Sequence, residues 1–240
     1  MQRGSVTALC ACLALLGPAL AACGSHGDRG SSPTALLKSK RFVSRVDNSW
    51  FPLTPGTAFV YRGVQDGEPG RDIVTVTGLS KVIQGVRCTV VYDRVYLRGR
   101  LFERTSDWYA QDDRGNVWYL GESTAELDRN GRVKSTEGSW EAGVDGAVAG
   151  ILMPAHPKVG QAFRQEFYKG EAEDHSQVLS VSARVRVPFT SSNTGLLTKE
   201  WTPLEPGVVD HKLYVRGIGE VKEETIRGGD ERFVLVDVQR

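Results

Sequence analysis

The sequence is short of cysteine. It holds 4 cysteines in 240 residues, and three of them, Cys10, Cys12 and Cys23, lie near its start. Only Cys88 remains for the rest of the chain, which excludes a disulfide within a folded domain. Cys88 alternates with apolar residues in a strand-like stretch. We therefore expect a buried, unreactive thiol rather than a nucleophile.

An excess of charge of one sign is also lacking. The chain has 30 Lys and Arg residues against 29 Asp and Glu residues, so its formal net charge at pH 7 is +1. Without a basic excess, nucleic acid is not an expected partner. The sequence also lacks a phosphate-binding glycine loop, a Gly-x-Ser-x-Gly nucleophile elbow and a His-x-x-x-His pair. These absences disfavour nucleotide binding and nucleophilic catalysis.

A long hydrophobic run occurs only at the start, and it is too short to span a bilayer. Residues 6–20 are apolar and end in Leu20-Ala21-Ala22-Cys23. This ending resembles the lipobox of bacterial lipoproteins, in which the Cys is acylated and becomes the new N-terminus. The alternative is an ordinary signal peptide with a chance Cys. We expect residues 1–22 to be a lipoprotein signal peptide and Cys23 to carry lipid.

The lipobox resemblance implies where the protein is located. A flexible tether, residues 23–40, follows the anchor and is rich in Gly, Ser and Pro. Acyl chains contribute about 0.8 kcal/mol per buried methylene, so two or three of them anchor a protein stably. The expected location is the extracytoplasmic face of the cell membrane, with the membrane itself as a partner.

Residues 41–240 are predicted to form a single all-β domain. No window shows a helical period over three turns, and short alternating strands follow one another. This spacing predicts an antiparallel meander with little helix. Because residues 55–140 and 157–238 share a similar order of features, we expect two similar halves that form a large curved sheet or half-barrel. The turn signals of the first half are Asp66-Gly67, Gly78, Gln84-Gly85 and Arg98-Gly99.

The stretch Asp107–Glu122 is the most informative hairpin. Two aromatic runs flank residues 112–116, where Asp and Asn side chains can bond to nearby backbone. Gly115 can take the positive φ that a short hairpin needs. The sequence therefore predicts two adjacent strands joined by a tight turn.

Four aromatic residues of this hairpin are predicted to divide between the two faces of the sheet. Trp108 and Trp118 share one face, and Tyr109 and Tyr119 share the other. Tryptophan has more apolar area to hide, whereas tyrosine can keep its hydroxyl wet. We expect the tryptophans to point into the core and the tyrosines to line the more accessible face.

Several stretches carry a resemblance to known proteins. Residues 50–57, 107–122, 138–147 and 170–174 resemble a family of uncharacterised bacterial secreted proteins and lipoproteins, over about residues 41–226. The motifs DWYAQDxxGNVWYLGE and GSWEAGVDGA are the specific ones. The family implies no activity. More loosely, residues 214–221 are similar to a strand turn of periplasmic curved-sheet proteins, some of which hold lipid in a half-barrel, and this likeness implies only the fold.

A metal site is one candidate for the chemistry. Glu173, Asp174 and His175 cluster between two predicted strands, and carboxylate and imidazole groups can bind calcium or zinc. A solvated acidic turn explains the same cluster more simply. We therefore expect no metal and no cofactor.

Two functions remain. In the first, Tyr109, Tyr119 and Glu122 contribute to a non-enzymatic binding module for an apolar small molecule, a glycan or an envelope partner. In the second, Glu122, Glu173, Asp174 or His175 serves a metal-assisted or carboxylate-dependent hydrolase of the cell envelope. Aromatic and apolar features are abundant, and catalytic ones are fragmentary. Binding is therefore favoured, and no catalytic residue is assigned.

Overall fold

The computed structural model describes Leu37 and residues 39–240. Cys23 and most of the predicted tether lie outside these residues. The elements within the described part are strands, and together they form an antiparallel, nearly closed barrel. The predicted mainly-β fold with little helix is confirmed. Among the described residues, no helix is long and apolar enough to cross a membrane.

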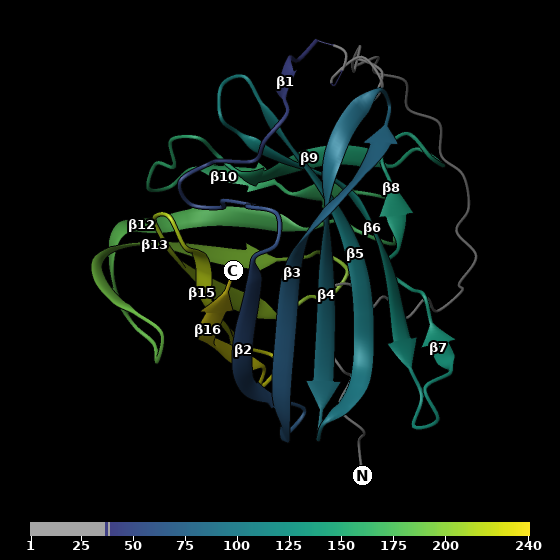
Figure 1. Cartoon of the computed structure of the whole chain (residues 1–240), viewed down its shortest axis with the longest axis vertical. Coiled ribbons are helices and arrows are strands. Elements are labelled where there is room, and N and C mark those ends of the chain that lie inside the picture. Colours follow the sequence, from purple (N-terminus) through teal and green to yellow (C-terminus); the bar gives the residue numbers. More distant parts are fainter. Residues whose placement is uncertain (1–36, 38) are drawn as a thin grey trace, which may run out of the picture.

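The first half of the chain forms a meander in which each strand pairs with the next. These long strands stand upright in Figure 1. Their side chains alternate between the interior of the barrel and its outer face. The strands are β2 (Ala58–Gln65), β3 (Glu68–Ile83), β4 (Val86–Leu97), β5 (Arg100–Asp112) and β6 (Val117–Leu127).

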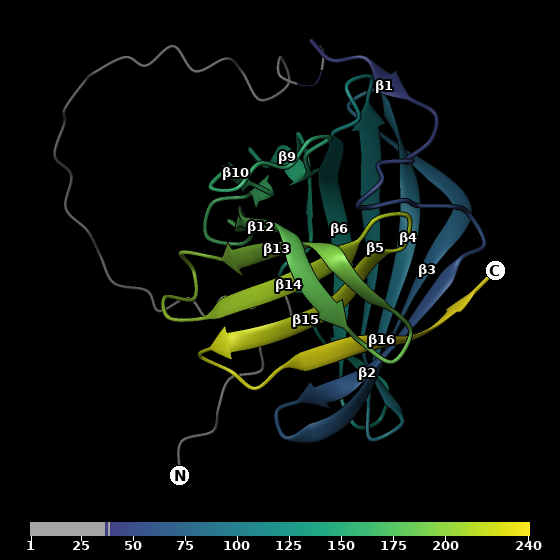
Figure 2. The same cartoon turned by 90° about the vertical axis from the view of Figure 1, so that its left-hand side faces the viewer.

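The second half forms another meander, and its last strand, β16, pairs with β2 to join the two halves into one sheet. In Figure 2 the strands of this second meander run across those of the first. The sheet thus folds over itself and encloses an interior. The strands are β12 (His175–Arg186), β13 (Ser191–Trp201), β14 (Val209–Val215), β15 (Gly219–Arg227) and β16 (Arg232–Gln239).

Short strands extend the sheet at its edges. β9 (Val148–Met153) pairs with β6, β11 (Glu166–Phe167) pairs with β9, and β10 (Ala162–Arg164) pairs with β12. Off this path, β1 (Phe42–Val43) pairs with β5, while β7 (Val133–Ser135) and β8 (Trp140–Glu141) pair with β6. The first meander falls within its predicted half, and the second ends one residue beyond its half, at Gln239. An origin by duplication stays a prediction.

Three of the four predicted turns join strands of the first meander. In each, both central residues have positive φ, as a two-residue type I′ hairpin requires. These pairs are Asp66 and Gly67 (φ 52° and 70°), Gln84 and Gly85 (48° and 82°), and Arg98 and Gly99 (49° and 75°). The prediction of a turn at Gly78 was wrong. β3 runs through this residue, and its pairing with β4 shifts register between Val76 and Ser80, so the glycine lies in a β-bulge rather than a turn.

The hairpin between β5 and β6 has the predicted turn. Gly115 has a φ of 86°. The Asp112 carboxylate accepts hydrogen bonds from the backbone N–H of Arg114 and Asn116 and from Nε1 of Trp118. Although burial acts to raise it, these hydrogen bonds hold the pKa of Asp112 below its usual value. The turn is therefore tied to the strand that follows it.

Apolar side chains pack on both faces of this hairpin. One buried cluster lies inside the barrel and includes Trp50, Val91 and Leu235. The other lies on the opposite face of β4–β6 and includes Trp108 and Trp118, which are 8% and 5% exposed. The prediction that both tryptophans are core residues is confirmed.

Cys88 belongs to the same outer cluster and is fully buried. Burial raises the pKa of its thiol to about 12, so the thiolate is not formed at neutral pH. The predicted burial of Cys88 is confirmed, and its lack of reactivity stays a prediction.

Candidate ligand-binding cavity

A cavity of about 200 Å³ lies inside the barrel, between the two meanders. One wall comes from β2–β6, and the facing wall comes from β13, β14 and β15. An engineered cavity of roughly 150 Å³ is enough to bind benzene. This volume is therefore sufficient for a small organic molecule.

Aromatic and aliphatic side chains supply part of the lining. Side chains alternate along each strand, which turns these residues inward. Residues 51–53, just before β2, add three more apolar side chains. Such apolar lining is typical of small-molecule sites. The main apolar contributors are Phe51, Pro52, Leu53, Phe59, Val74, Val91, Val95, Phe102, Leu152, Ile218 and Phe233.

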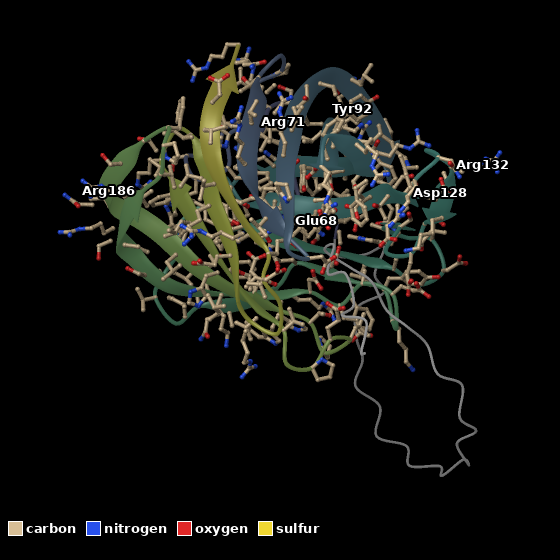
Figure 3. All side chains as sticks on the ribbon, turned by 90° about the horizontal axis from the view of Figure 1, so that it is seen from below. Glu68, Arg71, Tyr92, Asp128, Arg132 and Arg186 are labelled. Carbon is tan, nitrogen blue, oxygen red and sulfur yellow. The ribbon has the colours of Figure 1, made fainter. Side chains whose placement is uncertain are left out.

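The polar part of the lining is strongly acidic. It contains eleven carboxyl side chains, and Lys212 is the one cation among the described lining residues. Exposed arginines lie elsewhere: seen from below, Arg186 projects from the outside of the second meander and Arg132 from the far side of the first (Figure 3). The acids are Asp72, Asp93, Glu103, Asp107, Glu122, Glu166, Asp174, Glu200, Glu220, Glu223 and Glu231.

Lys212 is held by acids of the second meander. Its Nζ lies 3.2 Å from Glu223 Oε1, 3.5 Å from Glu200 Oε2 and 3.8 Å from Glu220 Oε2. Although burial acts to lower it, these carboxylates raise the pKa of Lys212 above its usual value. The single positive charge is thus shared by three acids of the same wall.

The first meander contributes a different arrangement. Asp107 and Glu122 are cross-strand partners on β5 and β6. Tyr119 donates a hydrogen bond from its hydroxyl to Asp107 Oδ1 at 2.7 Å. The rings of Tyr109 and Tyr119 stack with their centroids 4.9 Å apart, and both residues line the cavity. Two acids and two stacked tyrosines therefore lie together on this wall.

The structure brings Tyr109, Tyr119 and Glu122 together, as the hairpin pattern predicted. Their role in binding a ligand stays a prediction. The tyrosine face is the cavity wall rather than the outer surface, so Tyr119 is only 8% exposed, no more than Trp108. The prediction of a more accessible tyrosine face was wrong for Tyr119, because its hydroxyl is buried and donates to Asp107 instead of to water.

Burial raises the pKa of the acids on this wall. The pKa of Asp107 is raised to about 7 by burial and by the charge of Asp93. For Glu122, burial and the nearby carboxyls of Glu166 and Asp107 raise the pKa well above its usual value. Because a carboxylate is costly in such surroundings, these groups retain protons when no positive charge is near.

Asp72 and Asp93 show the same effect on neighbouring strands. Burial raises the pKa of both carboxyls, and the charge of Asp93 raises the pKa of Asp72 further. One oxygen of each carboxyl is buried without a hydrogen-bond partner in the described part of the protein.

The three residues of the predicted metal cluster point to different surroundings. Glu173 Oε1 accepts a hydrogen bond from the backbone N–H of Gly170, and the ring of His175 stacks on Trp201. Asp174 lines the cavity. Within residues 39–240 and Leu37, no group of three or more His, Cys, Asp or Glu side chains is placed to hold a metal ion.

Most of the acidic residues that line the cavity were not predicted from the sequence. A signal was present on β4, where Val91, Asp93 and Val95 share one face, and all three line the cavity. An acid on the apolar face of a strand is unusual because burial of a charge is costly. Asp72 and Val74 show the same pattern on β3.

No family model matches the chain, and no curated protein matches it. The predicted membership of a family of bacterial secreted proteins therefore stays a prediction. Two solved structures are similar. A predicted exported protein with a YmcC-like fold from Bacteroides fragilis is 15% identical, with 80% of this chain and 100% of that chain covered and a TM-score of 0.48. A predicted lipoprotein from Parabacteroides distasonis is 10% identical, with 80% and 99% covered and a TM-score of 0.45.

Proposed function

We propose that this protein is a non-enzymatic binding module that holds a small, partly apolar molecule inside its barrel. The observation that carries the proposal is the cavity of about 200 Å³ between the two meanders. Its wall combines apolar side chains with a few polar groups that converge on one space, which is the usual composition of a ligand site.

A small molecule fits the cavity better than a polymeric glycan or a protein partner. The polar and apolar side chains of the lining face the interior of the barrel. Trp108 and Trp118 would form a stacking platform if they were exposed, but they are buried in the outer cluster. A glycan chain or a protein surface would need such a platform on the outside. The interior instead suits a molecule that is enclosed on most sides.

Native mass spectrometry of protein purified from its own membranes tests this proposal. We expect a bound molecule in addition to the mass of the lipidated chain. Leu152→Trp places a larger side chain in the lining and should remove that molecule, whereas Val181→Trp, at an exposed position of β12, should retain it. If the protein carries no molecule, or if both folded variants retain it, the cavity is not the binding site.

We also propose that lipid on Cys23 anchors the protein at the extracytoplasmic face of the cell membrane, because the chain begins with a signal-like run that ends in Leu-Ala-Ala-Cys. Cys23→Ser should abolish incorporation of labelled fatty acid and release the protein from the membrane fraction. Cys88→Ser is the matched control and should leave both unchanged. Persistence of label and attachment in Cys23→Ser would refute the anchor.

Carboxylate-dependent hydrolysis is the second candidate. Asp107 and Glu122 are cross-strand neighbours with raised pKa values, and a protonated carboxyl beside a second one can serve as a general acid. The described lining residues include no Ser, Cys or His. A hydrolase in this cavity would therefore use its acids in place of a Ser, Cys or His nucleophile or base, and turnover of a bound molecule would distinguish it from a binding module.

A further inference from the structure

We propose that the cavity recognises a protonated organic amine, with its ammonium group held by Asp107 and Glu122 against the stacked rings of Tyr109 and Tyr119. This inference rests on the proposed binding function and specifies the chemical class of the ligand. Three features of the cavity carry it: its charge balance, an unpaired buried acid, and the aromatic surface beside that acid.

The charge balance leaves the wall of the first meander without a cation. Lys212 is within 4 Å of Glu200, Glu220 and Glu223. No described Lys or Arg makes an ion pair with Asp107 or Glu122. A positive charge brought in by a ligand would therefore meet two acids that have no direct ion pair with a described Lys or Arg.

Glu122 is an acid of this wall that has no cation beside it among the described residues. Its side chain lines the cavity and is only 7% exposed, yet its carboxyl accepts no hydrogen bond from any residue that the structure describes. The charged groups that act on it most strongly are all acids, beginning with Glu166 and Asp107. A buried carboxyl in this position is costly unless a donor or a cation reaches it.

The aromatic rings supply the second half of an ammonium site. Tyr109 stacks on Tyr119, and Phe51 packs edge-on against Tyr109 with ring centroids 5.3 Å apart. All three rings line the cavity. Aromatic faces attract cations, and desolvated cation–π contacts contribute about 2 kcal/mol or more. The same rings exclude water from the acids, which strengthens their attraction for a cation.

An amine fits this site better than a metal ion. The acids are spread along strands, and no three described His, Cys, Asp or Glu side chains converge as metal ligands. A metal ion would also gain nothing from the apolar part of the lining, such as Phe59, Val74 and Phe233. An amine with a hydrocarbon body uses both parts of the lining.

Calorimetric titration with three probes of one shape tests the inference. n-Hexylammonium, 1-hexanol and hexanoate share a hydrocarbon chain and differ in the charge of the head group. We expect n-hexylammonium to bind at least about tenfold more tightly than 1-hexanol, and hexanoate not to bind, because only the ammonium pairs with the buried acids. Calcium ions alone should give no binding heat.

Variants locate the site. Glu122→Gln and Asp107→Asn should each weaken n-hexylammonium binding about tenfold or more and should change 1-hexanol binding much less. Glu141→Gln is the matched control. Glu141 pairs with Gly121, one residue from Glu122, but its carboxylate faces outward to Lys81. Thermal unfolding of each variant shows that the barrel is intact.

The outcomes separate this inference from the proposed function. If 1-hexanol or hexanoate binds as tightly as the amine, the cavity is a ligand site, but the inference about an amine is wrong. The same holds if the amine binds and the two acid variants bind it unchanged, or if calcium binds in its place. If no probe binds, both the inference and the proposed function are contradicted.

Discussion

Raising the pH from about 5 to about 8 is expected to destabilise the ligand-free protein. Burial raises the pKa of Glu103 and Glu220 to about 8 and of Asp107 and Asp174 to about 7. In the unfolded chain, carboxyl groups of this kind have a pKa of about 4. Between these values the folded state binds more protons than the unfolded state, so the free energy of unfolding falls as pH rises. Each such group contributes about 1.4 kcal/mol per pH unit.

Asp112 and His211 have the opposite effect on how the free energy of unfolding depends on pH. The pKa of Asp112 is lowered by its hydrogen bonds despite burial, so its contribution is present at pH 5 and is lost only in stronger acid. Burial lowers the pKa of His211, which adds stability as pH rises through the unfolded value of about 6.5. One histidine does not outweigh four acids, and the net slope stays negative.

Thermal unfolding in buffers across this range measures the effect. Asp107→Asn should reduce the slope because it removes one of the titrating groups, and Glu141→Gln should leave it unchanged. A saturating amine should also flatten the slope, since its charge favours the ionised acids. A melting temperature that is constant or rises between about pH 5 and about pH 8 would show that the cavity acids ionise normally.

Trp118→Ala should destabilise the protein by about 3–5 kcal/mol. The ring is 5% exposed, packs edge-on against Phe42 at 6.3 Å between centroids, and donates a hydrogen bond from Nε1 to Asp112 Oδ2 at 3.0 Å. The substitution leaves a cavity in the outer cluster and removes one of the bonds that order the hairpin turn. Loss of that bond adds about 1 kcal/mol or more to the cost of the cavity.

Denaturant unfolding of three proteins separates these contributions. Trp118→Phe keeps an aromatic ring in the cluster but cannot donate to Asp112, so its loss should be smaller than that of the Ala variant. Tyr119→Phe changes the adjacent residue on the cavity face by one hydroxyl and should cost least. A loss below about 1 kcal/mol for Trp118→Ala would mean that the outer cluster contributes little to stability.

Local pattern was sufficient to predict the strands of the barrel. The turns at Asp66-Gly67 and Gln84-Gly85 were predictable because positive φ at both central residues favours Gly and short polar residues. Gly78 was misread for a related reason, since a glycine in a bulge and a glycine in a turn look alike in the sequence. Local rules identify where a strand can bend, but not whether its pairing continues beyond the bend.

The cavity depends on contacts that local pattern does not contain. Glu122 was found as a candidate in the aromatic hairpin, and that hairpin also brings Asp107 beside it. Lys212 and Asp93 face the same interior only because β16 pairs with β2 and closes the two meanders around it. The sequence predicted a curved sheet of two halves, but not which strand edges meet.

A crystal structure of the protein with n-hexylammonium bound tests the central claim most directly. We expect the ammonium nitrogen inside the barrel, within hydrogen-bond distance of the Asp107 and Glu122 carboxylates and over the face of the Tyr109 ring, with the hydrocarbon chain along the apolar lining. An amine bound only on the outer surface, or a cavity that holds no amine at saturating concentration, would contradict the account.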